Sequence, residues 1–127
     1  MSKIIVNSPD APAPIGPYSQ AVKAGNTLYI SGQIPFDQAT GEMINENITE
    51  ETHQVMKNLE AILSAAGMRF NNIVKCSIFI KDMNQFSTIN EAYGVYFKEN
   101  PPARECVEVA RLPKDVNVEI SCIAVDL

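Results

Sequence analysis

The feature that most restricts the fold of this chain is a change of apolar period between Thr49 and Phe97. From about Thr49 to Ala66, apolar side chains recur about every three or four residues, which is the spacing of an amphipathic helix. Ile73 to Ile80 is instead β-branched and alternating, as in a strand with one buried face. A second helical pattern runs from Gln85 to Phe97 and stops before Pro101-Pro102. In the strand, the side chains predicted to face the helices are Val74, Cys76, Ile78 and Ile80.

Strand patterns flank this central unit on both sides. The dipeptide Gly25-Asn26 suits a tight hairpin turn between two early strands. Strands are expected at Ala21 to Ala24, Thr27 to Ile34, about Glu105 to Ala110 and Val116 to Val125, with a further short one allowed near Met43. This order predicts an α+β fold in a single domain over residues 1–127, with a mixed β-sheet and two helices packed on one face.

Two helices on one face leave the other face of the sheet uncovered. Val107, Val109, Ile123 and Val125 point toward that face by strand alternation. Because an apolar sheet face is unfavourable in water, we expect the chain to self-associate through it.

Composition narrows the function classes. The formal charge of -5 and a pI near 4.8 disfavour nucleic acid and anionic membranes as partners. The three cysteines, Cys76, Cys106 and Cys122, have no metal-ligand spacing and suit buried reduced thiols. The start has no signal-like apolar stretch and no later segment resembles a membrane span, so a soluble cytoplasmic protein is expected.

The familiar catalytic signatures do not occur in the sequence. There is no Gly-rich phosphate loop, GxSxG elbow or HExxH, and the single histidine, His53, falls at the edge of a helical stripe. Metal-assisted hydrolysis and Ser/His catalysis are therefore disfavoured, and His53 is interpreted as a boundary residue without catalytic duty.

The remaining candidates are polar residues at strand ends and proline turns. Arg104 follows a rigid Pro-Pro-Ala segment and could grip a carboxylate with both arms of its guanidinium, although an arginine there is also typical of a surface ion pair. Glu119 lies in mid-strand with Asn117 and Ser121 on its face, which is equally typical of a solvated glutamate.

Four other residues allow a functional and an ordinary interpretation. Cys106 is either a reactive thiol or a packed small side chain. Asn90 borders the second helical stripe and either binds a ligand or caps backbone groups. Tyr18 and Ser31 lie in turn-like runs and fit either site or packing roles.

Together these residues carry a resemblance. The sequence resembles the reactive intermediate deaminase A family, also called the YjgF family, nearly from end to end. The matching stretches are Ile15 to Ala21 (IGPYSQA), Ile30 to Pro35 (ISGQIP), Asn58 to Gly67 (NLEAILSAAG), Val74 to Met83 (VKCSIFIKDM), Pro102 to Asp115 (PARECVEVARLPKD) and Val118 to Val125.

The resemblance implies a fold and an activity. The fold would be a chorismate-mutase-like, barrel-like homotrimer with clefts between subunits. The activity would be cofactor-independent hydrolysis of small imines and enamines, such as 2-aminoacrylate, 2-iminopropanoate and 2-iminobutanoate, to 2-keto acids and ammonia.

The resemblance also implies residue roles. Arg104 would bind the substrate carboxylate and Glu119 would position water, while Tyr18, Ser31, Gly32, Asn90 and Cys106 would line the site. Two departures from the family pattern are Glu105, where a small residue is common, and Ser121, where a glutamate is common. Alternation sends Glu105 to the face opposite Cys106, away from a bound carboxylate.

Other functions attached to this family stay open as hypotheses. A non-enzymatic trimer that senses keto or amino acids and modulates a partner, such as a transcription regulator, would bind ligand at Arg104 without hydrolysis. Ribonuclease or translation inhibition is disfavoured by the acidic charge. Chorismate mutase would need several cations, whereas only Arg104 is suitably placed.

Overall fold

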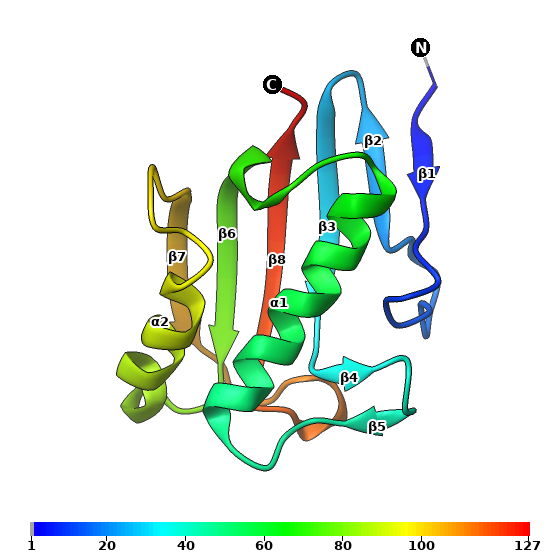
Figure 1. Ribbon diagram of the computed structural model, residues 1–127. Coiled ribbons are helices and arrows are strands. Elements are labelled where there is room, and N and C mark those ends of the chain that lie inside the picture. Colours follow the sequence, from blue (N-terminus) through cyan, green and yellow to red (C-terminus); the bar gives the residue numbers. More distant parts are fainter. Residues whose placement is uncertain (1) are drawn as a thin grey trace.

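The computed structural model describes residues 2–127 as a sheet with both α-helices on one face (Figure 1). The strands are β1 (Ile4–Val6), β2 (Ala21–Ala24), β3 (Thr27–Gln33), β6 (Ile73–Ile80), β7 (Ala103–Glu108) and β8 (Val118–Val125), with a separate hairpin of β4 (Phe36–Asp37) and β5 (Glu42–Met43). The helices are α1 (Ile48–Ala65) and α2 (Phe86–Gly94).

The strand order makes this a mixed sheet. The six-stranded sheet runs β1-β2-β3-β8-β6-β7, with β7 at one edge and β1 at the other. β6 and β7 are parallel, and the other neighbours in this sheet are antiparallel. The predicted α+β fold, with a mixed sheet and two helices on one face, is therefore confirmed.

Helix α1 supplies much of the core. Asn47 caps it by accepting a hydrogen bond from the backbone N–H of Glu50 at 2.9 Å. Val55, Leu59 and Ile62 are fully buried, as the helical stripe predicted. The helix begins and ends within one residue of the predicted bounds, and Gly67 follows it with a φ of +73°, a conformation that favours glycine.

The predicted side-chain orientation is wrong at the start of β6, where Val74 was expected to face the helices. The pairing between β6 and β8 shifts between Ile73 and Lys75, so an extra residue is inserted there. As a result Ile73 is 4% exposed and lies in the core, whereas Val74 is 42% exposed. The other predicted core residues of this strand, Cys76, Ile78 and Ile80, are buried.

Helix α2 is shorter than the helix predicted from the apolar pattern between Gln85 and Phe97. A 3-10 turn (Met83–Gln85) precedes it, and single turns follow Gly94. Tyr93 and Phe97 still stack with ring centroids 4.8 Å apart, so the stripe correctly identifies packing but not the helix end. Among the final strands, β7 begins and ends two residues before its predicted bounds, and β8 begins two residues late.

Two small elements have no predicted counterpart. β1 pairs with β2 although it lies in the segment before the prolines, and β4 is the partner of the short strand expected near Met43. The buried amide of Gln20 holds the proline-rich segment, since it accepts from the N–H of Ser8 at 2.6 Å and donates to the carbonyl of Pro12 at 2.9 Å.

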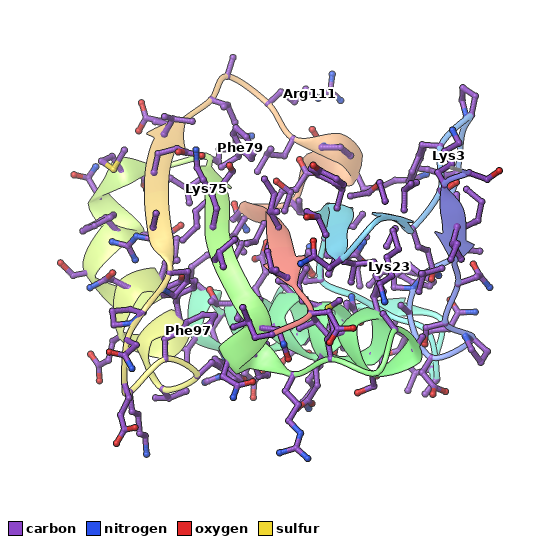
Figure 2. The ribbon with its side chains drawn as sticks, turned by 90° about the horizontal axis from the view of Figure 1, so that it is seen from above. Lys3, Lys23, Lys75, Phe79, Phe97 and Arg111 are labelled. Atoms are coloured by element: carbon purple, nitrogen blue, oxygen red, sulfur yellow. The ribbon has the colours of Figure 1, made fainter. Side chains whose placement is uncertain are left out.

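The sheet face away from the helices is uncovered in the single chain. Lys75 and Phe79 of β6 project from that side, while Phe97 lies on the helix side (Figure 2). Tyr29 and Val107 are exposed, and Ile123 and Val125 are only half-buried. We call this surface the open face. Among residues 2–127, no helix combines the length and the apolar character that crossing a membrane requires.

Candidate functional site

The candidate residues gather in two groups, of which the first surrounds Glu119. Tyr18, Ser31, Gly32 and Glu119, here called the Glu119 half-site, border one hollow of about 360 Å³. Glu119 is half-buried in β8 and projects on the open face, opposite the buried Val118 and Ile120.

The carboxylate of Glu119 lies against the backbone of Gly32. A Cβ atom at residue 32 would stand 2.8 Å from Cδ and 3.1 Å from Cγ of Glu119, closer than side chains normally approach. Glycine is therefore required here if Glu119 keeps its position. The pairing of β3 with β8 is irregular between Ile30 and Gln33, so Ser31 and Gly32 lie in a bulge, a device that often re-aims groups beside functional sites.

Ser31 holds the neighbouring loop. Its hydroxyl donates to the carbonyl of Ser19 at 2.6 Å, and its N–H donates to the carbonyl of Gln20 at 2.9 Å. The hydroxyl of Tyr18, in the same loop, accepts from the N–H of Ile15 at 3.3 Å. In the single chain, the side chain of Ser31 thus fixes the loop that carries Tyr18.

Burial governs the electrostatics of Glu119. Desolvation raises the pKa of this carboxyl above its ordinary value of 4.5. A carboxylate with a raised pKa is a better proton acceptor, which suits general-base chemistry.

The beginning of β8 is held from the helix side by Glu51 of α1. This carboxyl group is fully buried and accepts hydrogen bonds from the N–H of Asn117 at 2.6 Å, the amide of Asn117 at 2.9 Å and the N–H of Val118 at 3.2 Å. These bonds fix the backbone immediately before Glu119. This role was not predicted from the sequence, because an acidic residue in a first helical turn is ordinarily explained by its favourable interaction with the helix dipole.

The second group surrounds Arg104 near the start of β7. The guanidinium lies over the rings of Tyr93 and Phe86 of α2, 5.2 Å and 5.6 Å from their centroids, and donates to Oδ1 of Asn90 at 2.6 Å. With Cys106, Arg104 and Asn90 form what we call the Arg104 half-site. Of these, Arg104 and Asn90 line a hollow of about 320 Å³ together with Tyr93, Gly94, Phe97, Pro101 and Pro102.

Arg104 is oriented but not neutralised. Within residues 2–127 its guanidinium makes no ion pair with a carboxylate. Two rings and one amide hold the planar group while leaving its charge available to an anion. The position of Asn90 beside the helical stripe was the sequence signal for this contact.

Cys106 is half-buried, two residues beyond Arg104 on the same face. Burial raises the pKa of its thiol, and the positive charge of Arg104 opposes that effect only in part. The side chain packs against the core, which agrees with the ordinary interpretation of a small apolar residue rather than an activated nucleophile.

The two half-sites lie on opposite faces of the sheet. Arg104 pairs with Cys76, which lies under the helices, whereas Glu119 pairs with Phe79 on the open face. β6 also separates their strands. The single chain therefore brings Arg104 to Asn90 and Glu119 to Gly32, but it does not bring Arg104 to Glu119.

Glu105 follows the predicted alternation. It lies opposite Cys106 on the open face, where it accepts a hydrogen bond from Ser77 and pairs with Nζ of Lys75 at 3.0 Å. The Ser77 hydrogen bond first, and Lys75 second, lower the pKa of this carboxyl. Glu105 therefore does not face an anion bound at Arg104 of the same chain.

Other titratable groups lie elsewhere. His53 is half-buried and its Nδ1 lies 2.7 Å from the hydroxyl of Tyr96, so its predicted place at the edge of the apolar stripe of α1 is confirmed. Within residues 2–127, histidine, cysteine and acidic side chains do not gather in groups of three that could hold a metal ion.

The chain is similar to known proteins over nearly its whole length. The family described as Endoribonuclease L-PSP matches residues 8–126. A RutC family protein of Pyrococcus horikoshii is 53% identical over 96% of this chain and 97% of its own. The mouse 2-iminobutanoate/2-iminopropanoate deaminase is 48% identical over 98% of this chain and 95% of its own. The crystal structure of E. coli TdcF with bound serine aligns with a TM-score of 0.93 at 43% identity, covering 98% of this chain and 99% of that one.

Proposed function

Since the chain belongs to the reactive intermediate deaminase A (RidA/YjgF) family, the family described as Endoribonuclease L-PSP, we propose that it is a hydrolytic deaminase. Its substrates would be reactive enamines and imines such as 2-aminoacrylate, 2-iminopropanoate and 2-iminobutanoate. The products would be 2-keto acids and ammonia.

The observation that carries the proposal is the uncompensated, fixed charge of Arg104. Its guanidinium is held by Asn90 and two aromatic rings and has no carboxylate partner within residues 2–127. A 2-imino acid carries a carboxylate next to the reacting carbon, so binding that group at Arg104 fixes the position of the carbon. A charge-assisted hydrogen bond of this kind contributes about 1.5 to 3 kcal/mol.

Glu119 supplies the proton chemistry in this proposal. Its carboxylate accepts a proton from water as the water oxygen attacks the imine carbon, which gives a carbinolamine. With the imine nitrogen protonated at the outset, the same carboxyl returns the proton from water to the nitrogen of the carbinolamine. The C–N bond then breaks and ammonia leaves, while the hydroxyl passes its proton back to Glu119 as the C=O of the 2-keto acid forms. The raised pKa of Glu119 favours both transfers near neutral pH. Backbone groups near Gly32 and Cys106 would hold the imine nitrogen.

The opposite placement of Arg104 and Glu119 bears on how such a site is built. Because one chain does not unite them, we infer a site formed between two chains, in which Arg104 of one subunit meets Glu119 of the next. The open face, with exposed Tyr29 and Val107, offers the apolar surface for that association. The expected assembly is the homotrimer that the family resemblance implies.

Two alternatives differ from this proposal in chemistry. A keto-acid sensor would use Arg104 but would not need a half-buried glutamate beside Gly32. RNA cleavage, which the family description names, would need to attract a polyanion to a chain of net charge -5. The sensor gives Glu119 no task and the acidic charge disfavours RNA binding, so the imine hydrolase is preferred.

The test is imine decay in solution. A serine/threonine dehydratase generates 2-iminobutanoate in situ, and semicarbazide competes for it, so slower formation of the semicarbazone reports hydrolysis. Wild type should speed decay, Arg104→Ala and Glu119→Gln should lose most of that effect, and the exposed control Arg69→Ala should keep it. A wild type that binds 2-ketobutyrate but leaves decay unchanged would replace the deaminase with the sensor.

A further inference from the structure

A second hollow, of about 410 Å³, adjoins the Glu119 half-site and has no part in the proposed reaction. We propose that it is a side-chain subsite that selects 2-imino acids with larger apolar side chains, a specificity that rests on the proposed deaminase function. The four- to six-carbon alkyl series of imino acids is the predicted substrate range.

The two hollows share part of their lining. Ile15, Tyr18, Gly32 and Ile34 line both of them, so a molecule held at Glu119 can extend into the second hollow without leaving the protein surface. Gly32 contributes to the lining of both hollows, and its lack of a side chain leaves room for the Glu119 carboxylate beside it. An imino acid whose reacting carbon lies at Glu119 therefore has space beside it for a side chain.

The lining of the second hollow is mostly apolar. Pro12 and Ala13 come from the proline-rich segment, and Phe36 and Met43 come from the β4–β5 hairpin. The single charged lining residue is Lys114, beside the turn that leads to β8. Such a surface favours hydrocarbon side chains and disfavours basic ones, which would bury a charge without an acidic partner in the lining.

The walls are held in place by buried amides. Asn58 of α1 donates to the carbonyls of Ile34 and Phe36, both at 2.9 Å. Gln20 fixes the opposite wall by donating to the carbonyls of Ala11 at 3.3 Å and Pro12 at 2.9 Å. The volume lies within the usual range for ligand pockets, and a pre-formed pocket costs little ordering entropy to occupy.

The experiment compares imines that differ only in chain length. An L-amino-acid oxidase with catalase converts 2-aminobutanoate, norvaline and norleucine to their imino acids, and semicarbazide competition gives kcat/KM for each. Ala13→Phe fills the hollow from an exposed position, and Ala39→Phe, in the exposed turn of the β4–β5 hairpin outside the lining, is the matched control.

We expect kcat/KM of wild type and Ala39→Phe to rise by about four-fold per added methylene, the gain for burying one such group. In Ala13→Phe, kcat/KM for the imine of norleucine should fall to nearly the same value as kcat/KM for the imine of 2-aminobutanoate. A flat or falling series in wild type, or the same slope in Ala13→Phe, would overturn the subsite while leaving the deaminase intact.

A binding measurement separates the two proposals. If no imine is hydrolysed, the deaminase function fails, and calorimetric titration with 2-oxobutanoate and 2-oxohexanoate decides the subsite. Tighter binding of the longer keto acid, lost in Ala13→Phe, would keep the subsite. Equal affinities would remove it as well.

Discussion

The opposite faces of Arg104 and Glu119 lead to a subunit-complementation prediction. If each site takes Arg104 from one chain and Glu119 from the next, Arg104→Ala and Glu119→Gln chains are each inactive alone. In a mixed ring, a site is intact wherever an intact Arg104, from a Glu119→Gln chain, meets an intact Glu119, from an Arg104→Ala chain.

The expected recovery follows from counting. In a randomly mixed equimolar ring each interface has the required order of chains with a probability of about one quarter, whatever the ring size. Activity per chain should therefore return to about 25% of wild type in the unselected mixture. In trimers that contain both kinds of chain one site of three is intact, so about 33% is expected after purification through both tags. A site within one chain gives no recovery, because every chain carries one of the two substitutions.

The assay uses the two variants with different affinity tags, unfolded together in denaturant, refolded and purified through both tags in sequence. Imine decay is then measured against each variant refolded alone. Doubly tagged assemblies that stay as inactive as the parents would refute the two-chain site. Recovery in them would support it independently of the family resemblance.

Three further changes test parts of the half-site around Glu119. Gly32→Ala should reduce kcat for imine hydrolysis on the order of 100-fold by displacing the Glu119 carboxylate, with a nearly unchanged melting temperature; unimpaired turnover would show that the close approach is dispensable. Glu51→Ala should lower the free energy of unfolding by about 3 kcal/mol, because buried N–H groups of Asn117 and Val118 lose their acceptor; denaturant titration measuring under about 1 kcal/mol would contradict this. The pKa of Glu119 in the folded protein is raised above 4.5, so its carboxyl keeps its proton to higher pH than in the unfolded chain. The free energy of unfolding of wild type should therefore fall as pH rises from 4.5 through that folded pKa. Glu119→Gln should remove this slope in unfolding measurements, and an unchanged slope would assign it to other groups.

Much of the fold follows from apolar periodicity, and the misses have local causes. α1 and β6 are long segments whose period is unambiguous, so their bounds are predicted to within one residue. Val74 is misassigned because a bulge inserts a residue, and strand alternation cannot foresee a bulge. The stripe extends to Phe97 although α2 ends at Gly94, because the turns after the helix keep Phe97 packed on Tyr93.

The alternation of side chains along the strands was sufficient to predict that the two half-sites lie on opposite faces of the sheet. Val107 and Ile123 were both expected on the open face, and their exposure agrees. Arg104 is an odd number of residues from Val107, whereas Glu119 is an even number from Ile123, so they must project to opposite faces. What alternation could not supply is the set of partners: the rings beneath Arg104 and the close backbone of Gly32 depend on tertiary packing.

Dividing the site between two chains has an energetic consequence for the proposed assembly. Covering the open face removes more water from Glu119, which is already half-buried with a raised pKa, and this alone disfavours its charged form. An approaching Arg104 acts in the opposite direction, since a positive charge at about 4 Å contributes about 4 kcal/mol at an intermediate effective dielectric constant. The same guanidinium must also bind the substrate carboxylate, whose charge offsets this effect and raises the pKa of Glu119 again. Substrate binding would therefore make Glu119 a stronger base at the moment when water must be deprotonated, and an imine without a carboxylate would not have this effect.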